Sequence, residues 1–211
     1  MNLFPLALAF AFLCPNAQAK EQKKPKDKHL PKRYVQAGFH EARFTCEVPA
    51  KWKKIRSGLH DPEADAYGII LLGPKDKDGL SPSISVYYYT PDNADYEDAD
   101  DFLAAYRNTA MWTKKGQAAG KPRNVLLAGR PARSLRRDAY EYAPRTSVDS
   151  RDIQKREDFV ALPHGDGFFA LTYPATISEH ERWRPVFDRV LETFRPAALK
   201  ERTEPAAAPA R

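Results

Sequence analysis

Histidine and carboxylate side chains are the first candidates for chemistry in this chain, because they bind metals and transfer protons near neutral pH. The chain has five histidines, which are His29, His40, His60, His164 and His180. Two of them, His40 and His180, precede a glutamate but lack the second histidine that a zinc-protease helix carries four residues further on. His164 lies in a segment with the turn residues of a hairpin loop, so we expect it to be solvated.

Acidic residues gather in two places. A metal site could be formed by His60, Asp61, Glu63 and Asp65 as ligands, but we expect no metal there. The second group is Asp92, Asp95, Glu97, Asp98, Asp100 and Asp101. A calcium loop of the EF-hand type requires a central glycine and a fixed ligand spacing, and both are missing here. Acids also favour the N-terminus of a helix, so we expect a helix start instead of a calcium site.

Sequence motifs of the common catalytic and phosphate-binding sites are absent. The chain contains no G-x-S-x-G elbow, no Walker A loop and no G-x-G-x-x-G turn. Cys46 alternates with Phe44 and Val48 in a strand-like segment, which predicts a small core residue and not a reactive thiol. We therefore expect a protein that is not an enzyme and that holds no cofactor.

Arginines form the first candidate surface for a partner. Arg133 and Arg137 share one side of a predicted strand, while Arg136 lies on the other side. Guanidinium groups suit carboxylate or phosphate partners, so this surface is a candidate binding site. The alternative is an edge strand that uses its charge to block aggregation.

Tyrosines form the second candidate surface. Tyr87 and Tyr89 share one face of another predicted strand. If they are exposed, they form an aromatic platform beside Trp112 that a partner could contact. The alternative is that a helix buries them.

The residues before position 20 have the features of an export signal. They carry no charged side chain, and their apolar run is about half of the ~20 residues that span a bilayer. Ala17-Gln18-Ala19 matches the small-x-small site of signal peptidase. We expect a signal peptide over residues 1–19 and a mature chain that is exported to the periplasm or beyond the cell, with no transmembrane segment. Leu13 before Cys14 does not fit a lipobox, so we do not expect lipid anchoring at Cys14.

The basic charge of the chain is concentrated near its start. The net charge is +6, and residues 20–33, from Lys20 to Arg33, carry seven basic and two acidic side chains. The rest of the chain is close to neutral, so we expect no nucleic-acid partner, which would need a basic folded face. Residues 20–33 read as a disordered linker, with weak contact to an anionic surface as the alternative. Residues 198–211 read as a disordered tail.

Between these tails, strand-like segments alternate with turn residues. The predicted strands cover residues 44–48, 67–72, 83–89, 124–128, 132–142, 158–162 and 168–173. One helix is predicted over residues 95–109. A second has a capping box of Ser178 and Glu181, carries a single apolar stripe and ends before Pro196. The turn between Pro163 and Gly167 predicts that the last two strands are antiparallel.

The faces of two strands decide the predicted architecture. Residues 83–89 and 168–173 are apolar on both sides, which is typical of strands in the middle of a sheet that is covered above and below. The two amphipathic helices would cover one face each. We predict one α+β domain over residues 34–197, a mostly antiparallel β-sheet sandwiched by α-helices.

Several motifs, in order, resemble the PsbP-like superfamily. The opening strand matches in Phe44-x-x-x-Val48-Pro49-x-x-Trp52, the middle in Leu127-Ala128-Gly129-Arg130-Pro131-Ala132, and the end in Phe168-Phe169-Ala170-Leu171-Thr172-Tyr173 with Phe187-x-x-Val190-Leu191-x-x-Phe194. The resemblance covers residues 44–196. It implies an α/β/α sandwich used for binding, with no catalytic residues to carry over. Relatives of this kind include an extrinsic subunit of photosystem II, a Ran-binding import factor and bacterial exported proteins of unknown role.

Together these observations predict an exported, non-catalytic accessory or binding protein of the bacterial envelope that acts through contact with a protein partner. The alternative is an exported hydrolase that acts on a cell-wall or extracellular substrate. A hydrolase would need a deep pocket that contains a histidine or carboxylate with a strongly shifted pKa.

Overall fold

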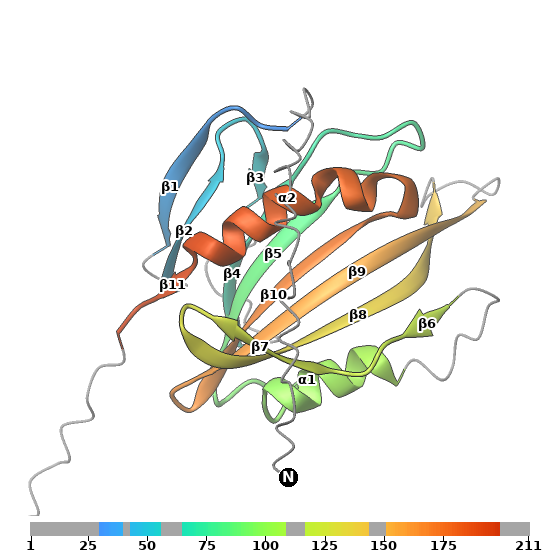
Figure 1. Cartoon of the computed structure of the whole chain (residues 1–211). Helices are drawn as coiled ribbons and strands as arrows, with labels where there is room; N and C mark the ends of the chain where they lie inside the picture. Colours follow the sequence, from blue (N-terminus) through green and yellow to red (C-terminus); the bar gives the residue numbers. More distant parts are fainter. Residues whose placement is uncertain (1–29, 40–42, 56–64, 109–116, 144–150, 199–211) are drawn as a thin grey trace, which may run out of the picture.

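The computed structural model describes residues 30–39, 43–55, 65–108, 117–143 and 151–198 (Figure 1). The predicted signal peptide, most of the basic linker and most of the C-terminal tail lie outside these ranges, as do His29, His40, His60 and Trp112. In the part of the chain that is described, no helix has the length and apolar character needed to cross a membrane.

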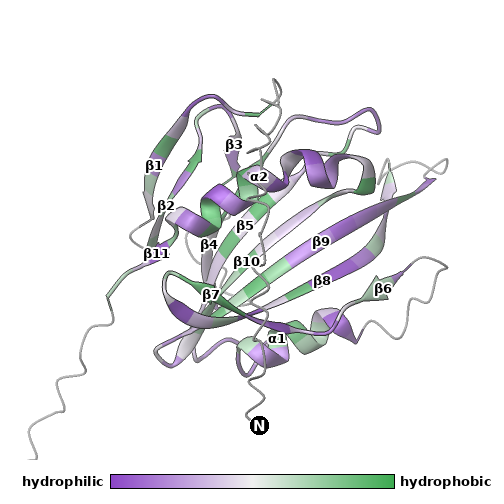
Figure 2. Ribbon diagram, viewed as in Figure 1, coloured by the Kyte–Doolittle hydropathy of each residue, from purple (hydrophilic) through white to green (hydrophobic). Residues whose placement is uncertain are grey.

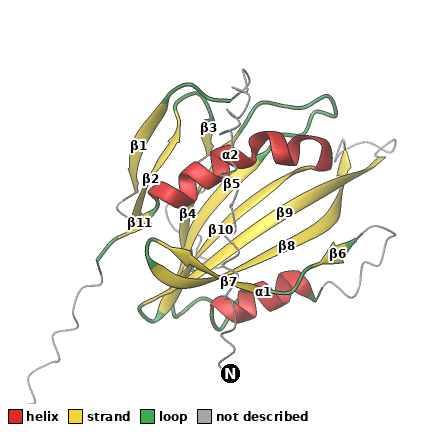
Figure 3. Ribbon diagram, viewed as in Figure 1, coloured by secondary structure: helices red, strands yellow, loops and turns green. Residues whose placement is uncertain are grey.

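A large antiparallel sheet occupies the centre of the molecule (Figure 3). Within the described ranges its strand order is β3-β4-β5-β10-β9-β8-β6, and β7 also pairs with β8. The strands are β3 (Lys53–Ile55), β4 (Ala66–Leu72), β5 (Ser83–Tyr89), β6 (Ala118–Ala119), β7 (Arg123–Leu127), β8 (Arg130–Ala143), β9 (Arg151–His164) and β10 (Gly167–Thr176). The two strands with apolar residues on both faces, β5 and β10, are neighbours in the middle of the sheet, which confirms their predicted position. The antiparallel pairing of β9 with β10 is confirmed as well.

A second, three-stranded sheet consists of β1 (Tyr34–Phe39), β2 (Phe44–Pro49) and β11 (Arg195–Pro196). β2 lies in the middle, with the first and the last described strands on its two sides. Residues 44–48 were correctly predicted as a strand, but the sequence did not indicate that this strand belongs to a separate sheet. Phe44 connects the two sheets, because its ring lies 6.1 Å from that of Phe169 on β10.

The two helices cover opposite faces of the large sheet, as predicted (Figure 1). Helix α2 (Ile177–Thr193) packs its apolar stripe on one face, together with the small sheet, through Trp183, Val186, Phe187 and Val190. Helix α1 (Ala99–Arg107) packs on the other face through Ala99, Phe102 and Leu103. Figure 2 shows hydrophobic residues on the central strands, whereas the outer parts of β8 and β9 are largely hydrophilic.

The N-termini of both helices can be compared with the predictions made for them. Asp98 caps α1, because its carboxylate accepts hydrogen bonds of 2.8 Å from the backbone N–H groups of Asp100 and Asp101. The acid cluster therefore marks a helix start. The predicted capping box of α2 is wrong. β10 runs directly into α2, so Thr176 is the N-cap and Ser178 already lies inside the helix. The Thr176 hydroxyl donates to Asp76 at 2.9 Å instead of capping the helix.

Gly167 begins β10 where this strand lies closest to β5. A Cβ at this position would collide with the backbone oxygen of Tyr89 and would lie 2.9 Å from the Tyr88 hydroxyl. Gly167→Ala should therefore force the two central strands apart and lower the free energy of unfolding by about 2 kcal/mol. Gly120→Ala is the control, because its Cβ would lie 3.4 Å from the Arg136 oxygen, an ordinary contact. Chemical denaturation measures both losses, and equal losses would contradict the close approach.

Candidate functional site

The predicted arginine surface lies on the α1 side of β8. Arg137 is only 14% exposed, forms an ion pair with Glu157, and stacks 4.8 Å above the Tyr106 ring. Arg133 is 38% exposed and lies 3.1 Å from a carboxylate oxygen of Asp100. β7 and β6 pair with β8 at these positions, so the alternative of an edge strand is wrong for both arginines. Their contact with a partner stays a prediction.

The predicted tyrosine platform lies on the same side of the sheet. The Tyr89 ring stacks on Phe168 with centroids 4.9 Å apart and lies 5.8 Å from Phe102 of α1. Burial raises the pKa of Tyr89 well above its usual range. Tyr89 therefore packs against α1, as the alternative expected, and is partly buried there. Tyr87 lies beside it, at a centroid distance of 6.3 Å, and its role as a contact residue stays a prediction.

The prediction that His164 is solvated is wrong. β9 continues to His164, and the alternation of the strand turns this side chain into the core, where it is 4% exposed. Its ring lies 5.1 Å from that of Phe169, and the Arg130 guanidinium lies 2.7 Å from its Nδ1. Burial, and next the charge of Arg130, lower the pKa of His164. The residue is a neutral core group that orients Arg130.

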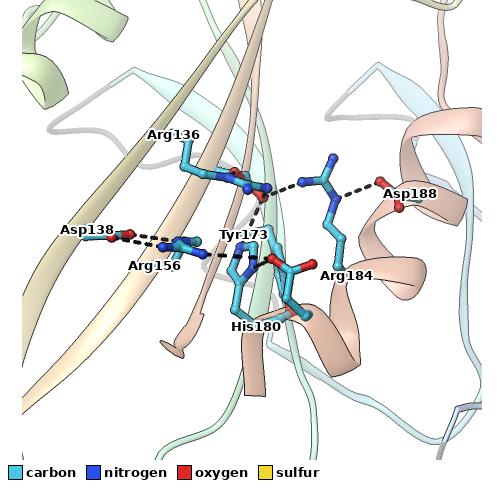
Figure 4. A network of polar contacts seen from close by, with 9 residues as sticks. Arg136, Asp138, Arg156, Tyr173, His180, Arg184 and Asp188 are labelled. Atoms are coloured by element: carbon cyan, nitrogen blue, oxygen red, sulfur yellow. Dashed lines mark hydrogen bonds and ion pairs between the residues drawn. The ribbon is translucent and has the colours of Figure 1, made fainter. Parts of the chain in front are cut away.

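Asp158 on β9 is the centre of a polar network between the large sheet and α2 (Figure 4). Arg136 of β8 binds its carboxylate with two hydrogen bonds, of 2.6 Å from Nε and 3.0 Å from Nη2. Arg184 of α2 donates a further bond of 2.6 Å from Nη1. His180 Nε2 lies 3.0 Å from Oδ2 of the same carboxylate. Three basic groups from two layers of the fold thus share one carboxylate.

The protonation of Asp158 follows from these neighbours. Burial by itself would raise the pKa of this carboxyl group, but its polar contacts with His180 and Arg136 and the charge of Arg184 hold the pKa well below its usual range. Asp158 is therefore a carboxylate at every physiological pH. A carboxylate with so low a pKa is a poor general base, because its affinity for a proton is small.

His180 is fully buried in this network. Its side chain has no exposed area, its ring lies 4.9 Å from that of Tyr173, and the Tyr173 hydroxyl donates to its backbone oxygen at 2.7 Å. A substrate cannot reach a ring in this position. Cys46 is buried too, and burial raises the pKa of its thiol to about 12. Neither side chain is placed to act as a nucleophile or proton donor toward a bound substrate.

A cavity of about 290 Å³ opens beside Asp158, between α2 and the strand edge formed by β6 and β8. We call it the cationic pocket, and its charged lining residues are Lys121, Arg123, Arg136, Arg184 and Asp158. Figure 4 shows Arg136 from the sheet and Arg184 from the helix reaching toward each other. Lys121 and Arg123 are exposed, and neither side chain forms an ion pair with another described residue. Four cations against one carboxylate give the lining of this pocket an excess of positive charge.

The sequence did not indicate this pocket, since its basic residues come from three separate elements. For Arg136 the sequence predicted only that it lies on the other face of the strand from Arg133 and Arg137. The structure confirms this position. Among the described residues, no cluster of three or more histidine, cysteine or acidic side chains is arranged to hold a metal ion.

No protein-family model matches the sequence, and no curated protein matches it. Solved structures that are similar to it include the following three. PA94, a Pseudomonas aeruginosa protein of unknown function, shares 17% identity, with 79% of this chain and 99% of that chain covered and a TM-score of 0.45. LpqN, involved in cell envelope biogenesis of Mycobacterium tuberculosis, shares 16% identity, with 79% and 91% covered and a TM-score of 0.46. Cyanobacterial PsbP (CyanoP) of Synechocystis sp. PCC 6803 shares 11% identity, with 77% and 92% covered and a TM-score of 0.47.

Proposed function

We propose that this chain is an exported, non-catalytic binding protein of the bacterial envelope, and that its cationic pocket receives a carboxylate side chain of a protein partner. The observation that carries the proposal is the placement of Arg136 and Arg184 around Asp158, beside two further cations. The export signal predicted over residues 1–19 supports a place in the periplasm or outside the cell.

The geometry of the two arginines favours binding. A guanidinium group has five N–H donors, and Asp158 takes only Nε and Nη2 of Arg136 and Nη1 of Arg184. Asp188 accepts from Nε of Arg184 at 2.7 Å. The remaining donors border the pocket on side chains that are already held in place. A partner carboxylate therefore binds with a smaller loss of side-chain entropy than it would on free arginines.

Two exposed cations of the pocket test the proposal. The double variant Lys121→Glu with Arg123→Glu reverses the charge at the rim but leaves the network around Asp158 unchanged. We expect it to recover at least about fivefold less of a reproducible partner from crosslinked envelope extracts, because opposite charge across an interface steers the encounter.

The control for this experiment is Arg195→Glu, which reverses an exposed charge on β11, away from the cationic pocket and from the α1 side of the large sheet. It should recover as much partner as the unchanged protein. If no partner is recovered reproducibly, or if the control loses as much as the double variant, the cationic pocket is not the binding site.

The predicted contact residues on the α1 side remain part of this proposal. Arg133 and Tyr87 are partly exposed there, whereas Arg137 and Tyr89 act through the packing of α1. Alanine variants of Arg133 and Tyr87 in the same capture experiment show whether a partner also contacts this face.

A further inference from the structure

A second concave surface lies at the other end of the domain, where α2 begins. A cavity of about 450 Å³ is bounded by the segment before β1, the turn between β2 and β3, and the end of β4. A neighbouring cavity of about 630 Å³ extends along the β4–β5 connection to the first turns of α2. The two share Pro74 and Trp183, so together they form one groove, which we call the tryptophan groove.

The floor of the first cavity is apolar and well packed. Trp52 and Trp183 meet edge to face with ring centroids 5.8 Å apart, and both rings belong to the main core. The indole N–H of Trp183 donates to Glu179 at 2.9 Å, so no polar group of this ring remains for a ligand. The other apolar lining residues of this cavity are Leu30, Pro31, Leu72, Gly73 and Pro74. Such a surface suits a hydrocarbon chain.

The charged residues of this cavity all carry the same sign. They are Lys32, Arg33, Lys51 and Lys53, each of them exposed. No acidic residue occurs among the described residues that line the cavity. The sequence just before Leu30 adds five lysines between positions 20 and 28, against two acids. The positive charge of the basic linker therefore continues into the folded domain, around an apolar floor.

We infer that the tryptophan groove binds a membrane lipid with an anionic headgroup, whose acyl chain lies along Trp52 and Trp183 while the headgroup contacts the surrounding lysines. An acidic peptide would match the charge but would leave the apolar floor unfilled. Three of the four cations around the first cavity are lysines, which act as mobile point charges and do not require the planar, bidentate fit of arginine with a carboxylate. Basic residues near an anionic lipid surface each add to the attraction.

Tryptophan fluorescence tests this inference directly. The chain has three tryptophans, so the variant Trp112→Phe retains only the two that line the groove. Lysophosphatidylglycerol with a brominated acyl chain, added below its micelle concentration, should quench their emission with a saturable dependence. Brominated lysophosphatidylcholine, which has no net charge, should bind at least about tenfold more weakly.

Charge reversal completes the test. In the Trp112→Phe background, Lys51→Glu with Lys53→Glu should weaken lysophosphatidylglycerol binding about tenfold, since both side chains are exposed at the edge of the first cavity. Lys121→Glu with Arg123→Glu is the matched control and should leave lipid binding unchanged. It also separates this inference from the proposed function, because each double variant affects one site only.

Three results would overturn the inference. The first is the lack of saturable quenching by the anionic lipid. The second is equal binding of the anionic and zwitterionic lipids, which would show that the lysines do not contribute. The third is binding of an oligoglutamate peptide in place of the lipid, which would assign the groove to a protein partner.

Discussion

Asp158→Asn should lower the free energy of unfolding by about 3 kcal/mol, the loss typical of breaking a buried ion pair by removing one partner. Asp158 is 9% exposed, balances the charges of Arg136 and Arg184 at once, and lies 3.0 Å from His180 Nε2. An asparagine fills the same space but carries no charge, so the buried His180 ring and the two guanidinium groups lose their common anion. Chemical denaturation followed by tryptophan fluorescence measures the loss.

The control for this prediction is Asp188→Asn. Asp188 also binds Arg184, at 2.7 Å, but it is 45% exposed and water can replace it. Its loss should cost less than about 1 kcal/mol. Similar losses for the two variants would show that the network around Asp158 does not depend on its burial.

The same carboxylate predicts how stability depends on pH. The pKa of Asp158 is lowered in the folded state, so its contribution is fully present above the pKa of an unfolded aspartate, about 3.9. The contribution is lost as the pH falls from there through the lower folded pKa. The unchanged protein should therefore lose stability more steeply below about pH 4 than Asp158→Asn does.

Phe169→Ala should lower the free energy of unfolding by about 4 kcal/mol, because it removes a large ring from the densest part of the core. Phe169 has no exposed area, and its ring lies within 6.1 Å of those of Phe44, Tyr88, His164 and Phe194. These neighbours come from both sheets and from the end of α2. The cavity left by alanine therefore lies where three parts of the fold meet and cannot close by moving one side chain.

Two further variants serve as controls for this prediction. Phe169→Leu keeps most of the volume and should cost about 1 kcal/mol. Leu126→Ala removes a side chain that is 75% exposed and should change stability by less than about 0.5 kcal/mol. A loss for Phe169→Ala no larger than that of the leucine variant would mean that the core relaxes around the missing ring.

The layers of the fold could be predicted because they depend on patterns that are complete within single segments. β5 and β10 are apolar on both faces, and each helix carries its own stripe, so their positions follow from segments of at most seventeen residues. The small sheet could not be predicted in this way. β11 consists of two residues, Arg195 and Pro196, and becomes a strand only because β2 offers it an open edge.

The two long outer strands were predicted to different extents. Residues 132–142 were predicted as a strand and cover most of the fourteen-residue β8, whereas only residues 158–162 of the fourteen-residue β9 were predicted. Charged side chains interrupt the first half of β9, so the alternation of apolar and polar residues gives no strand signal there. Ion pairs across the strands replace apolar contacts in this region, for example between Arg156 and Asp138 at 2.8 Å.

The sequence contains a signal for the network around Asp158, but it is visible only when β9 and α2 are considered together. Alternation with Val160 and Leu162 places Asp158 on the α2 face of its strand, and the helical period places His180 on the stripe of Trp183 and Phe187. A buried carboxylate that faces a buried histidine could have been proposed from these two patterns. The contributions of Arg136 and Arg184 depend on the register of the strands and the position of α2, which the sequence does not specify.

The pairing of β2 with both β1 and β11 has a consequence for the order in which the domain forms. Residues 34–39 and 195–196 flank the same strand, and the Ala197 N–H donates to the Arg43 oxygen at 2.7 Å. During synthesis, the small sheet cannot close until residue 197 has left the ribosome, when almost the whole domain is outside. Contacts so distant in sequence form slowly. A chain built in this way therefore completes its small sheet later than one whose first strands pair with each other alone.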